Sequence, residues 1–441
     1  MLFFLNLQLS NFNWQAVFNP IIKHLVDHKL LLPKRRIDRV FNFQKFMHKI
    51  RNIKEAFIAA AIIIGFTGLI SFLPLKFEFL KAIRQDVYGF DIYDLYYTEK
   101  HKNNLRRDTN IILVQIEDER DKIAHQINIL RACNPDVIGI DAVFDNRKNP
   151  AEDSAFLQSI ANAENIVFAT RLEIENGQLT PRSNFFDTIN SGEHSGYINF
   201  VGNQYSVIRT YAPFLNSKGK AHFSFSSRII QLFSPGSFDT LKWRKHPEEI
   251  INYTGNTEKY TSITKEELLE YAATHQLSGL FKNKIVLLGY FIKYPPFVLQ
   301  DLHFSPLNEQ FAGKSFPDMY GVVIHANILS MILERNYANL ASNTASYLYA
   351  FLITFLFLLY IIHLHSKKNH PAHAKILLIQ FLLILFVLYF FLELYSLFLW
   401  KLPLLPVLIS LVLCIELLGL YKIIALWLHK KTGYATVFNH K

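Results

Sequence analysis

Four stretches of this 441-residue chain are long enough and apolar enough to cross a membrane as helices. The hydrocarbon layer of a bilayer is roughly 30 Å thick, which a helix of about 20 residues spans. A helix of a soluble protein seldom stays apolar on every face over that length, because one of its faces meets water. The sequence therefore predicts four transmembrane helices, at residues 56–75, 346–364, 376–400 and 404–428.

The excess of positive charge lies beside these stretches. Residues 1–76 contain 11 Lys and Arg against 3 Asp and Glu, and residues 345–441 contain 8 against 2. Residues 77–344 contain 27 against 31, so the large middle region is mildly acidic although the whole chain has a net charge of +10. A nucleic-acid-binding domain carries a basic surface instead. The charge distribution therefore predicts the lipid bilayer as a partner and argues against nucleic acid.

Basic residues also predict the orientation of the chain, because Lys and Arg favour cytoplasmic loops. They cluster before the first stretch, between the second and third, and after the fourth, whereas the turn between the last two stretches has only Lys401. Both termini are therefore expected inside and the middle region outside. The predicted segments are a cytoplasmic segment (1–55), a transmembrane helix (56–75), an extracytoplasmic domain (76–345), three transmembrane helices (346–428) and a short cytoplasmic tail (429–441).

The first 32 residues leave two interpretations open. Polar residues such as Asn6, Gln8 and Asn11 interrupt the apolar start, so no cleavable signal peptide is expected. The segment could lie as an amphipathic helix on the inner membrane surface. It could equally be an ordinary cytoplasmic helix.

Short apolar runs alternate with helical patterns in the external region. The runs IILVQI (111–116), VIGI (137–140), IVFAT (166–170) and KIVLL (284–288) are typical of strands that are buried on both faces. Helical spacing follows at 119–133, 151–163 and 320–335, and a short helical lead is expected within 77–100. The alternation predicts an α/β domain with a mostly parallel sheet that is covered on both faces. Residues 172–255 are predicted to be rich in short strands.

A succession of motifs runs through the same region. These are IILVQIED (111–118), NPDVIGIDAVF (134–144), GYINFVGNQYSVIR (196–209), FKNKIVLLG (281–289), DLHFSP (301–306) and GVVIHANIL (321–329). Their order resembles the type-two CHASE domain, a sensory extracellular domain of bacterial cyclases and histidine kinases. One leading and three trailing transmembrane helices are also the arrangement of that family. The turn at 203–206 departs from the family pattern because it lacks acidic residues, which puts a ligand role of that turn in doubt.

The resemblance implies a sensor in a bacterial cytoplasmic (inner) membrane with a periplasmic domain. Family members often carry a cyclase or kinase module after the last helix, and here about 13 residues follow it. Output is therefore expected from the N-terminal segment or from a partner, either a signalling protein of the cytoplasm or membrane or an envelope complex. A homodimer is compatible with these features. A structural subunit of an envelope complex is the alternative function.

Polar residues that follow the predicted strands are candidate ligand contacts, because open parallel sheets bind ligands beyond the carboxyl ends of their strands. Carboxylates and imidazoles at one edge could bind a divalent cation or a small polar ligand. In the alternative interpretation the carboxylates cap helices and His325 packs inside its helix. The candidates at the strand ends are Glu117, Asp118, Asp141 and Asp145, and the nearby closing motifs at 301–306 and 321–329 add Asp301, His303, His325 and Asn327.

An enzymatic role is not expected. The sequence contains no serine elbow, no phosphate-binding glycine loop and no Cys/His pair with zinc-like spacing. Neither a cofactor nor a metal ion is therefore predicted. The remaining enzymatic hypothesis is a membrane enzyme that uses Asp141, Asp301, His303 and His325.

Glu416 lies near the middle of the fourth predicted membrane helix. A lone carboxylate at that depth is costly in lipid and usually faces other protein. Two interpretations stay open for this residue. It could form a structural hydrogen bond with a neighbouring helix, or it could contact a partner's helix or act in a signal or proton relay.

Overall fold

The computed structural model describes residues 34–72, 91–103, 106–175, 178–186, 194–201, 207–217, 219–274, 279–293, 300–308, 316–365 and 373–439. The two interpretations of residues 1–32 and the turn at 203–206 lie outside these ranges. The chain divides into two compact units, which we describe separately. The first comprises Met1–Phe72, Tyr347–Leu382 and Leu404–Lys441, and the second comprises Leu73–Ser346 and Leu383–Pro403.

Four long helices contain the predicted membrane spans. They are α3 (Lys34–Phe72), α13 (Asn343–His365), α14 (His373–Phe398) and α15 (Leu405–Thr432). By length and composition the candidate spans are Lys49–Ile70, Asn343–Leu364, His373–Phe398 and Leu405–Thr432. The last three agree with the sequence prediction within a few residues. The first begins earlier than predicted, because α3 continues unbroken from the basic segment that precedes the apolar stretch.

Aromatic and polar contacts join the helices of the first unit. Helix α3 packs along α15, and Tyr421 of α15 donates a hydrogen bond to Glu55 of α3. Thr354 Oγ1 of α13 donates to Ser410 Oγ of α15 at 3.0 Å. The side chain of Gln380 in α14 donates to backbone carbonyls of α15. Such interhelical hydrogen bonds satisfy polar groups that lipid would leave unpaired.

The second unit is built on a six-stranded parallel sheet. Its strand order is β11 (Thr261–Ile263), β1 (Ile111–Gln115), β12 (Ile285–Gly289), β2 (Val137–Asp141), β3 (Ile166–Thr170) and β6 (Ser195–Tyr197). The central strand β12 pairs with β1 and β2 in a register that places Gly289 beside Gln115 and Asp141. The four apolar runs in the sequence are the four central strands, so the prediction of a mostly parallel sheet is confirmed.

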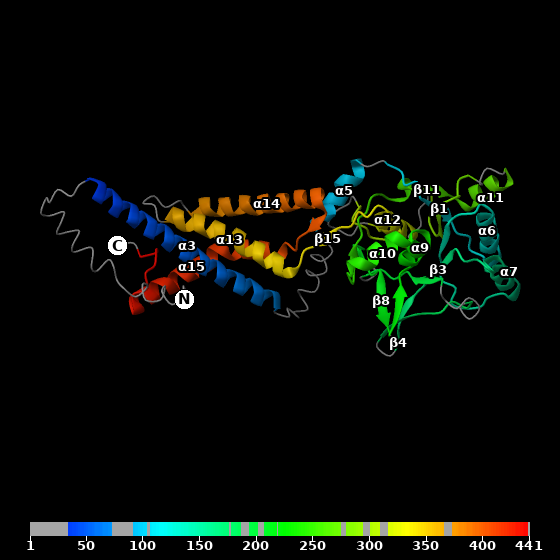
Figure 1. Ribbon diagram of the computed structural model, residues 1–441, viewed down its shortest axis with the longest axis horizontal. Coiled ribbons are helices and arrows are strands. Elements are labelled where there is room, and N and C mark those ends of the chain that lie inside the picture. Colours follow the sequence, from blue (N-terminus) through cyan, green and yellow to red (C-terminus); the bar gives the residue numbers. More distant parts are fainter. Residues whose placement is uncertain are drawn as a thin grey trace. The chain divides into compact units, whose positions relative to one another are not determined.

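Helices cover both faces of this sheet (Figure 1). On one face lie α6 (Arg120–Ala132), α7 (Pro150–Ile160) and α11 (Lys265–Ala273), which share a continuous apolar core with the strands. On the other face lie α9 (Phe225–Phe233) and α12 (Gly321–Leu333), with α10 (Pro235–Arg244) packed against both. Helix α9 approaches the sheet so closely at Gly139 that a Cβ atom there would lie 2.6 Å from Ile229 Cδ1.

The region 172–255 contains more helix than the sequence indicated. Helices α9 and α10 have nine and ten residues and meet at Ser234, which ends one and precedes the other. Their brevity and the aromatic and β-branched residues of α9 make the segment resemble a strand in the sequence. The predicted short strands also occur. They are β4 (Leu172–Glu175), β5 (Gln178–Pro181), β7 (Thr210–Tyr211), β8 (Phe214–Ser217), β9 (Lys220–Phe223) and β10 (Glu249–Ile250).

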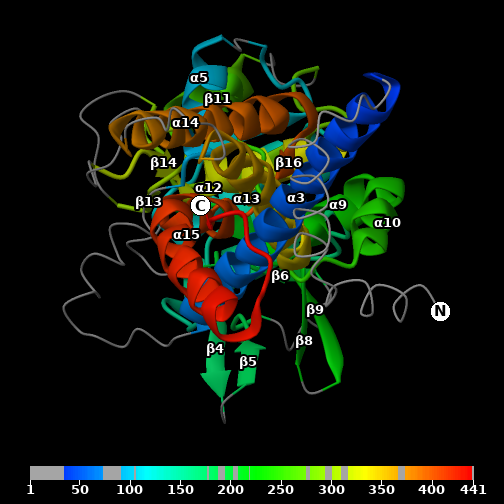
Figure 2. The same ribbon diagram turned by 90° about the vertical axis from the view of Figure 1, so that its left-hand side faces the viewer.

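Two of these strand pairs form ribbons that extend from the sheet. The β4–β5 and β8–β9 ribbons point in the same direction (Figure 2). The remaining short elements of the unit are α5 (Asp94–Asn103), the 3₁₀ turn η1 (Thr257–Lys259), β13 (Leu302–His303), β14 (Met319–Tyr320), β15 (Asn339–Leu340) and β16 (Trp400–Lys401). They build the candidate sites described next.

Candidate functional site

Three of the predicted strand-end carboxylates have basic partners of their own. Lys265 Nζ lies 3.4 Å from Glu117 Oε2 and 3.5 Å from Asp118 Oδ2. Arg182 Nε lies 3.5 Å from Asp145 Oδ1. These ion pairs are at least partly exposed, and such pairs contribute little to stability. They are separate surface pairs, and the structure does not bring them into one site.

Asn327 supports the fold through its buried side chain. Its Oδ1 accepts a hydrogen bond from Thr254 N at 2.9 Å, and its Nδ2 donates to Gly255 O at 2.9 Å. The side chain therefore joins α12 to the loop that precedes η1. With these hydrogen bonds made, Asn327 has a structural explanation that the sequence did not reveal.

The other four candidates lie around the first turns of α12. Asp141 ends β2 beside Gly289, where an added Cβ atom would lie 3.3 Å from Asp141 Cβ. Asp301 meets the start of α12, because a Cβ atom at Gly321 would lie 3.1 Å from Asp301 Oδ2. His303 Nε2 lies 3.6 Å from Asp301 Oδ1. The two glycines thus let the start of α12 approach the strand ends.

His325 is the buried member of this group. Its Nδ1 lies 3.0 Å from Ser226 Oγ of α9, and its ring centroid lies 4.9 Å from that of Phe200 and 5.1 Å from that of Phe225. Burial lowers the pKa of His325 to about 3, and the neighbouring His303 adds to that shift. The imidazole is therefore neutral at ordinary pH and acts as a packed polar side chain.

Asp141 carries the opposite perturbation. Burial raises the pKa of its carboxyl to about 8, and the charge of Asp301 adds to the shift. No hydrogen bond to the Asp141 side chain occurs among the described residues. Within the same residues, no group of three His, Cys, Asp or Glu side chains could hold a metal ion. The cluster is thus a partly enclosed acid beside two imidazoles, without the geometry of a metal site.

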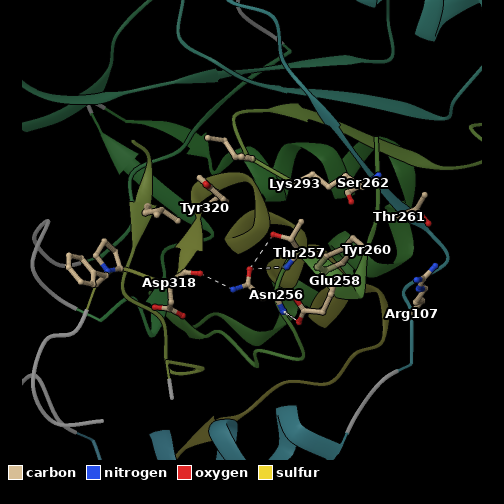
Figure 3. A pocket seen from close by; sticks show the side chains of 14 residues that line it. Arg107, Asn256, Thr257, Glu258, Tyr260, Thr261, Ser262, Lys293, Asp318 and Tyr320 are labelled. Carbon is tan, nitrogen blue, oxygen red and sulfur yellow. Dashed lines mark hydrogen bonds between the residues drawn. The ribbon is translucent and has the colours of Figure 1, made fainter. Parts of the chain in front are cut away.

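A cavity of about 930 Å³ opens beside β11, the edge strand of the sheet (Figure 3). Ligand cavities of proteins commonly have volumes of about 300–1,000 Å³. The lining combines hydroxyl groups, charges of both signs and an apolar part. Its residues are Arg107, Asn256, Thr257, Glu258, Tyr260, Thr261, Ser262, Ile292, Lys293, Leu302, Phe316, Pro317, Asp318 and Tyr320.

Hydrogen bonds within the wall of the cavity fix its polar side chains. Asn256 Nδ2 donates to Asp318 O at 2.8 Å, and its Oδ1 accepts from Thr257 N at 2.8 Å (Figure 3). The carboxylate of Asp318 accepts from Ser305 N at 2.8 Å. A wall that is already bonded in this way needs little rearrangement when a ligand enters.

The β13–β14 ribbon separates the cavity from the acid–imidazole cluster. Leu302 pairs with Tyr320 and His303 pairs with Met319, and alternate residues of a strand point to opposite faces. Leu302 and Tyr320 line the cavity, whereas the ring of His303 lies 5.5 Å from Phe200. One two-residue ribbon therefore forms a common wall between the two sites.

The base of the sheet domain contains a group of contacts that the sequence analysis missed. Arg209 donates two hydrogen bonds to the carboxylate of Asp94 in α5. Its Nε lies 2.9 Å from Oδ1, and its Nη2 lies 2.5 Å from Oδ2. The Tyr97 hydroxyl lies 2.5 Å from the Tyr395 hydroxyl of α14. In the sequence, only the aromatic-rich segment 93–97 and the arginine of the 196–209 motif could have indicated these contacts. Neither pattern shows which residue each side chain contacts.

Further contacts attach this base to the residues that end α14. Lys401 pairs with Asp91, and Tyr93 donates a hydrogen bond to Leu402 O at 2.9 Å. Strands β15 and β16 pair in parallel, so residues 339–340 lie beside 400–401. We call the contacts of residues 91–97 and β15 with residues 395–402, together with the Arg209–Asp94 pair, the base clamp. All of them lie within the second unit of the chain.

Comparison with protein-family models matches residues 62–362 to the CHASE2 domain. This range covers more than half of the chain. The chain belongs to the CHASE2 domain family. Comparisons with characterised proteins and with solved structures give no match.

The match defines which parts of the candidate sites belong to the CHASE2 domain. The acid–imidazole cluster and the cavity lie inside the matched residues, as do Asp94 and Arg209 of the base clamp. Tyr395, Lys401 and Leu402 lie beyond them. The base clamp therefore joins the CHASE2 domain to a membrane helix outside the matched range.

Proposed function

We propose that the protein is a membrane-anchored sensor whose CHASE2 domain lies outside the cytoplasmic membrane of a bacterium and signals through a partner. CHASE2 is a family of sensory extracellular domains, and four helices are apolar enough to cross a membrane, which fits a multi-pass membrane protein. The basic residues that flank the helices support a periplasmic position for the domain. The proposal assigns no catalytic step to the domain.

The observation that carries this proposal is the base clamp. A sensor needs a physical connection by which a change in its domain reaches the membrane. Here the domain contacts residues 395–402 through the ion pair of Asp91 with Lys401, a buried tyrosine pair and backbone pairing. The bidentate Arg209–Asp94 pair fixes α5 within the domain. Helix α14 runs without a break from His373 to Phe398. A domain movement that shifts Tyr395 therefore acts on the outer end of a membrane helix.

We assign the ligand site of this sensor to the cavity beside β11. Its wall includes the β13–β14 ribbon, which leads directly into α12. A small polar ligand would displace water from the hydroxyl-rich surface and contact the apolar part at Leu302 and Phe316. Thr261→Trp, a substitution that fills the cavity, should abolish any shift in melting temperature that a panel of amino acids, sugars and dicarboxylates produces. If a ligand still shifts the melting temperature of this variant, the cavity is not the ligand site.

The position of the domain can be tested with surface labelling. Trp243 of α10 is 84 % exposed, whereas both native cysteines are buried. A membrane-impermeant maleimide should label Trp243→Cys in spheroplasts, and it should label Lys430→Cys near the end of α15 only after lysis. The reverse pattern would place the CHASE2 domain inside the cell and contradict the proposal.

The signalling partner can be sought by crosslinking native membranes, purifying the protein in mild detergent and identifying the proteins that accompany it. A kinase, cyclase or other regulator is the expected result. Asp94→Ala, which breaks the base clamp, should leave the partner bound but alter the signalling output. Isolation of the protein alone, together with an unchanged signalling output on gene deletion, would contradict a sensory role.

One observation favours a structural role as the second candidate. The external domain exposes Trp243 at 84 % and Ile174 at 74 %. Contiguous apolar patches on a surface often mark protein contacts, and a contact of this kind would be sought at these two side chains. If envelope components are recovered instead of a regulator, and if Trp243→Ser prevents that recovery, the domain is an interaction platform.

A further inference from the structure

Helix α15 presents two different faces along its length. One face is buried in the unit and consists of Val407, Leu411, Cys414, Leu418, Tyr421 and Ala425, with Ser410 beside them. The opposite face is exposed, with Val412 at 57 % and Ile423 at 65 %. No described segment of the chain covers this second face. In a membrane it therefore meets lipid or another protein.

Glu416 lies on the exposed face. It is the twelfth residue of a helix with 28 residues, so it lies well inside the span. The described part of the chain provides no hydrogen bond or ion pair for its carboxyl. An ionisable group at that depth almost always faces protein or a water-filled cavity, because lipid cannot solvate it. The exposure of Glu416 therefore indicates a protein contact that the described part of the chain leaves open.

Two other carboxylates in the membrane helices show the contrast. Glu55 is 1 % exposed and accepts a hydrogen bond from Tyr421. Glu393 is exposed, but it lies only five residues before the end of α14 at Phe398 and is hydrogen-bonded to Tyr389. Both of these groups thus have a partner. Among the described residues Glu416 has no partner, and it has no short path to water.

The residues around Glu416 fit a second helix. Gly419 lies three residues further along the same face, and a Cβ atom there would meet nothing within 4 Å. Small residues let membrane helices approach each other closely. Val412, Glu416, Gly419 and Ile423 follow the spacing i, i+4, i+7 and i+11, which is the spacing of a helix-pairing stripe. We call these four residues the Glu416 face.

We propose that the Glu416 face binds the same face of a second copy of this chain. A carboxylic acid both donates and accepts hydrogen bonds. Two Glu416 side chains that meet across a two-fold axis therefore satisfy each other. Two copies in one membrane have the same orientation, which places both carboxyls at the same depth, and an interface of this kind is self-complementary. A different protein would need its own polar group at that depth.

Disulfide crosslinking in native membranes tests this contact. In a chain with Cys133→Ala and Cys414→Ala, single cysteines replace Val412 or Ile423 on the Glu416 face. The matched controls replace Leu411 or Leu418, which are 0 % and 7 % exposed on the opposite face. Oxidation should give a covalent dimer at 412 and 423 and little at 411 and 418, because a disulfide needs Cα atoms within about 7 Å.

Substitution of Glu416 tests the carboxyl itself. Glu416→Leu should lower the dimer association constant in vesicles by about 3- to 30-fold, the range expected for a hydrogen bond between membrane helices. Glu416→Gln keeps a donor and an acceptor and should retain most of the association. Glu393→Leu removes an equally exposed carboxylate from α14 and should leave the association unchanged.

Equal crosslinking on both faces of α15, absence of a dimer, or a dimer that is insensitive to Glu416→Leu would overturn the proposal. Crosslinking of residues 412 and 423 to a different protein would also overturn it. None of these results depends on the sensory role, because the readout is association in the membrane and requires neither ligand nor signal.

Discussion

Charged side chains have different surroundings at the base of the sheet domain and at the carboxyl ends of its strands. At the base, Asp94 is bound by Arg209 and Asp91 is paired with Lys401. At the strand ends, burial holds the pKa of Asp141 near 8 and that of His325 near 3. Burial raises the pKa of Asp94 as well, but the Arg209 guanidinium fixes its geometry. Asp141 and His325 have no ion-pair partner among the described residues. The base is therefore held by ion pairs, whereas the charge state of the strand-end cluster depends on its burial.

The largest effect is expected at the base. Asp94→Ala leaves Arg209 without the partner that holds it, and breaking a largely buried ion pair costs about 3–5 kcal/mol. The free energy of unfolding of the sheet domain, measured by chemical denaturation in detergent, should fall by about that amount. Arg182→Ala removes the exposed contact with Glu173 and should cost less than about 1 kcal/mol. Equal losses of unfolding free energy in the two variants would show that the ion pair at the base is no more stabilising than an exposed pair.

The next effect concerns the neutral imidazole at the strand ends. The folded-state pKa of His325, about 3, lies below its ordinary value of 6.5. The unfolded chain therefore binds the extra proton first, and the stability due to a neutral His325 is lost as pH falls below about 6.5. Between pH 7.5 and 5, the stability advantage of wild type over His325→Asn should shrink by about 2 kcal/mol. A constant difference over that range would show that His325 is not a buried neutral group.

Asp141 should show the opposite sign. Its folded-state pKa, about 8, lies above its ordinary value of 3.8, so the folded protein keeps a proton that the unfolded chain releases. Stability is lost as pH rises from about 4 to 8. Because the side chain is only partly enclosed, Asp141→Asn should stabilise the protein by about 1.5 kcal/mol at pH 8 and have little effect at pH 4. Urea denaturation of both proteins at the two pH values measures the difference, and an equal effect at both would contradict the raised pKa.

The smallest effect is expected for a single hydroxyl of the base clamp. Tyr395→Phe keeps the ring contacts with Tyr93 and Tyr97 but removes the bond to the Tyr97 hydroxyl. The loss should be about 1 kcal/mol, visible as a lower melting temperature. Tyr360 of α13 is 46 % exposed, and Tyr360→Phe is the matched control with no expected change. A similar loss of stability in the control would mean that the hydrogen bond between Tyr395 and Tyr97 does not stabilise the protein.

The sequence predicted the central sheet and the membrane helices because both have strong local signals. The runs IILVQI and KIVLL are apolar on every face, as strands covered on both faces must be. Helix α9 carries no such signal, because its nine residues resemble a strand. The base clamp was missed for another reason. Arg209 and Asp94 are 115 residues apart, and no local pattern pairs them.

The candidate site was predicted only in part. The strand-end rule located Asp141, since the carboxyl ends of parallel strands share one edge, and the closing motifs added Asp301 and His303. It also selected Glu117 and Asp118, whose partner Lys265 follows a strand that the sequence analysis did not identify. The sequence does not show which way the Glu416 side chain points, because the apolar residues around it in α15 occupy every face of the helix. Only the packing of α15 shows which face is left open.

Hydrogen–deuterium exchange at the base clamp tests the central claim most directly, namely that the sheet domain holds the Phe398 end of α14. The amides of Asn339 and Ala341 donate to Leu399 O and Lys401 O, and Leu402 N donates to the Tyr93 hydroxyl. In lipid nanodiscs, Arg209→Ala should speed exchange at residues 339–341 and 399–402 and leave residues 411–425 of α15 unchanged. Unchanged exchange at 339–341 and 399–402 would contradict the claim, because the domain would then not hold the helix end.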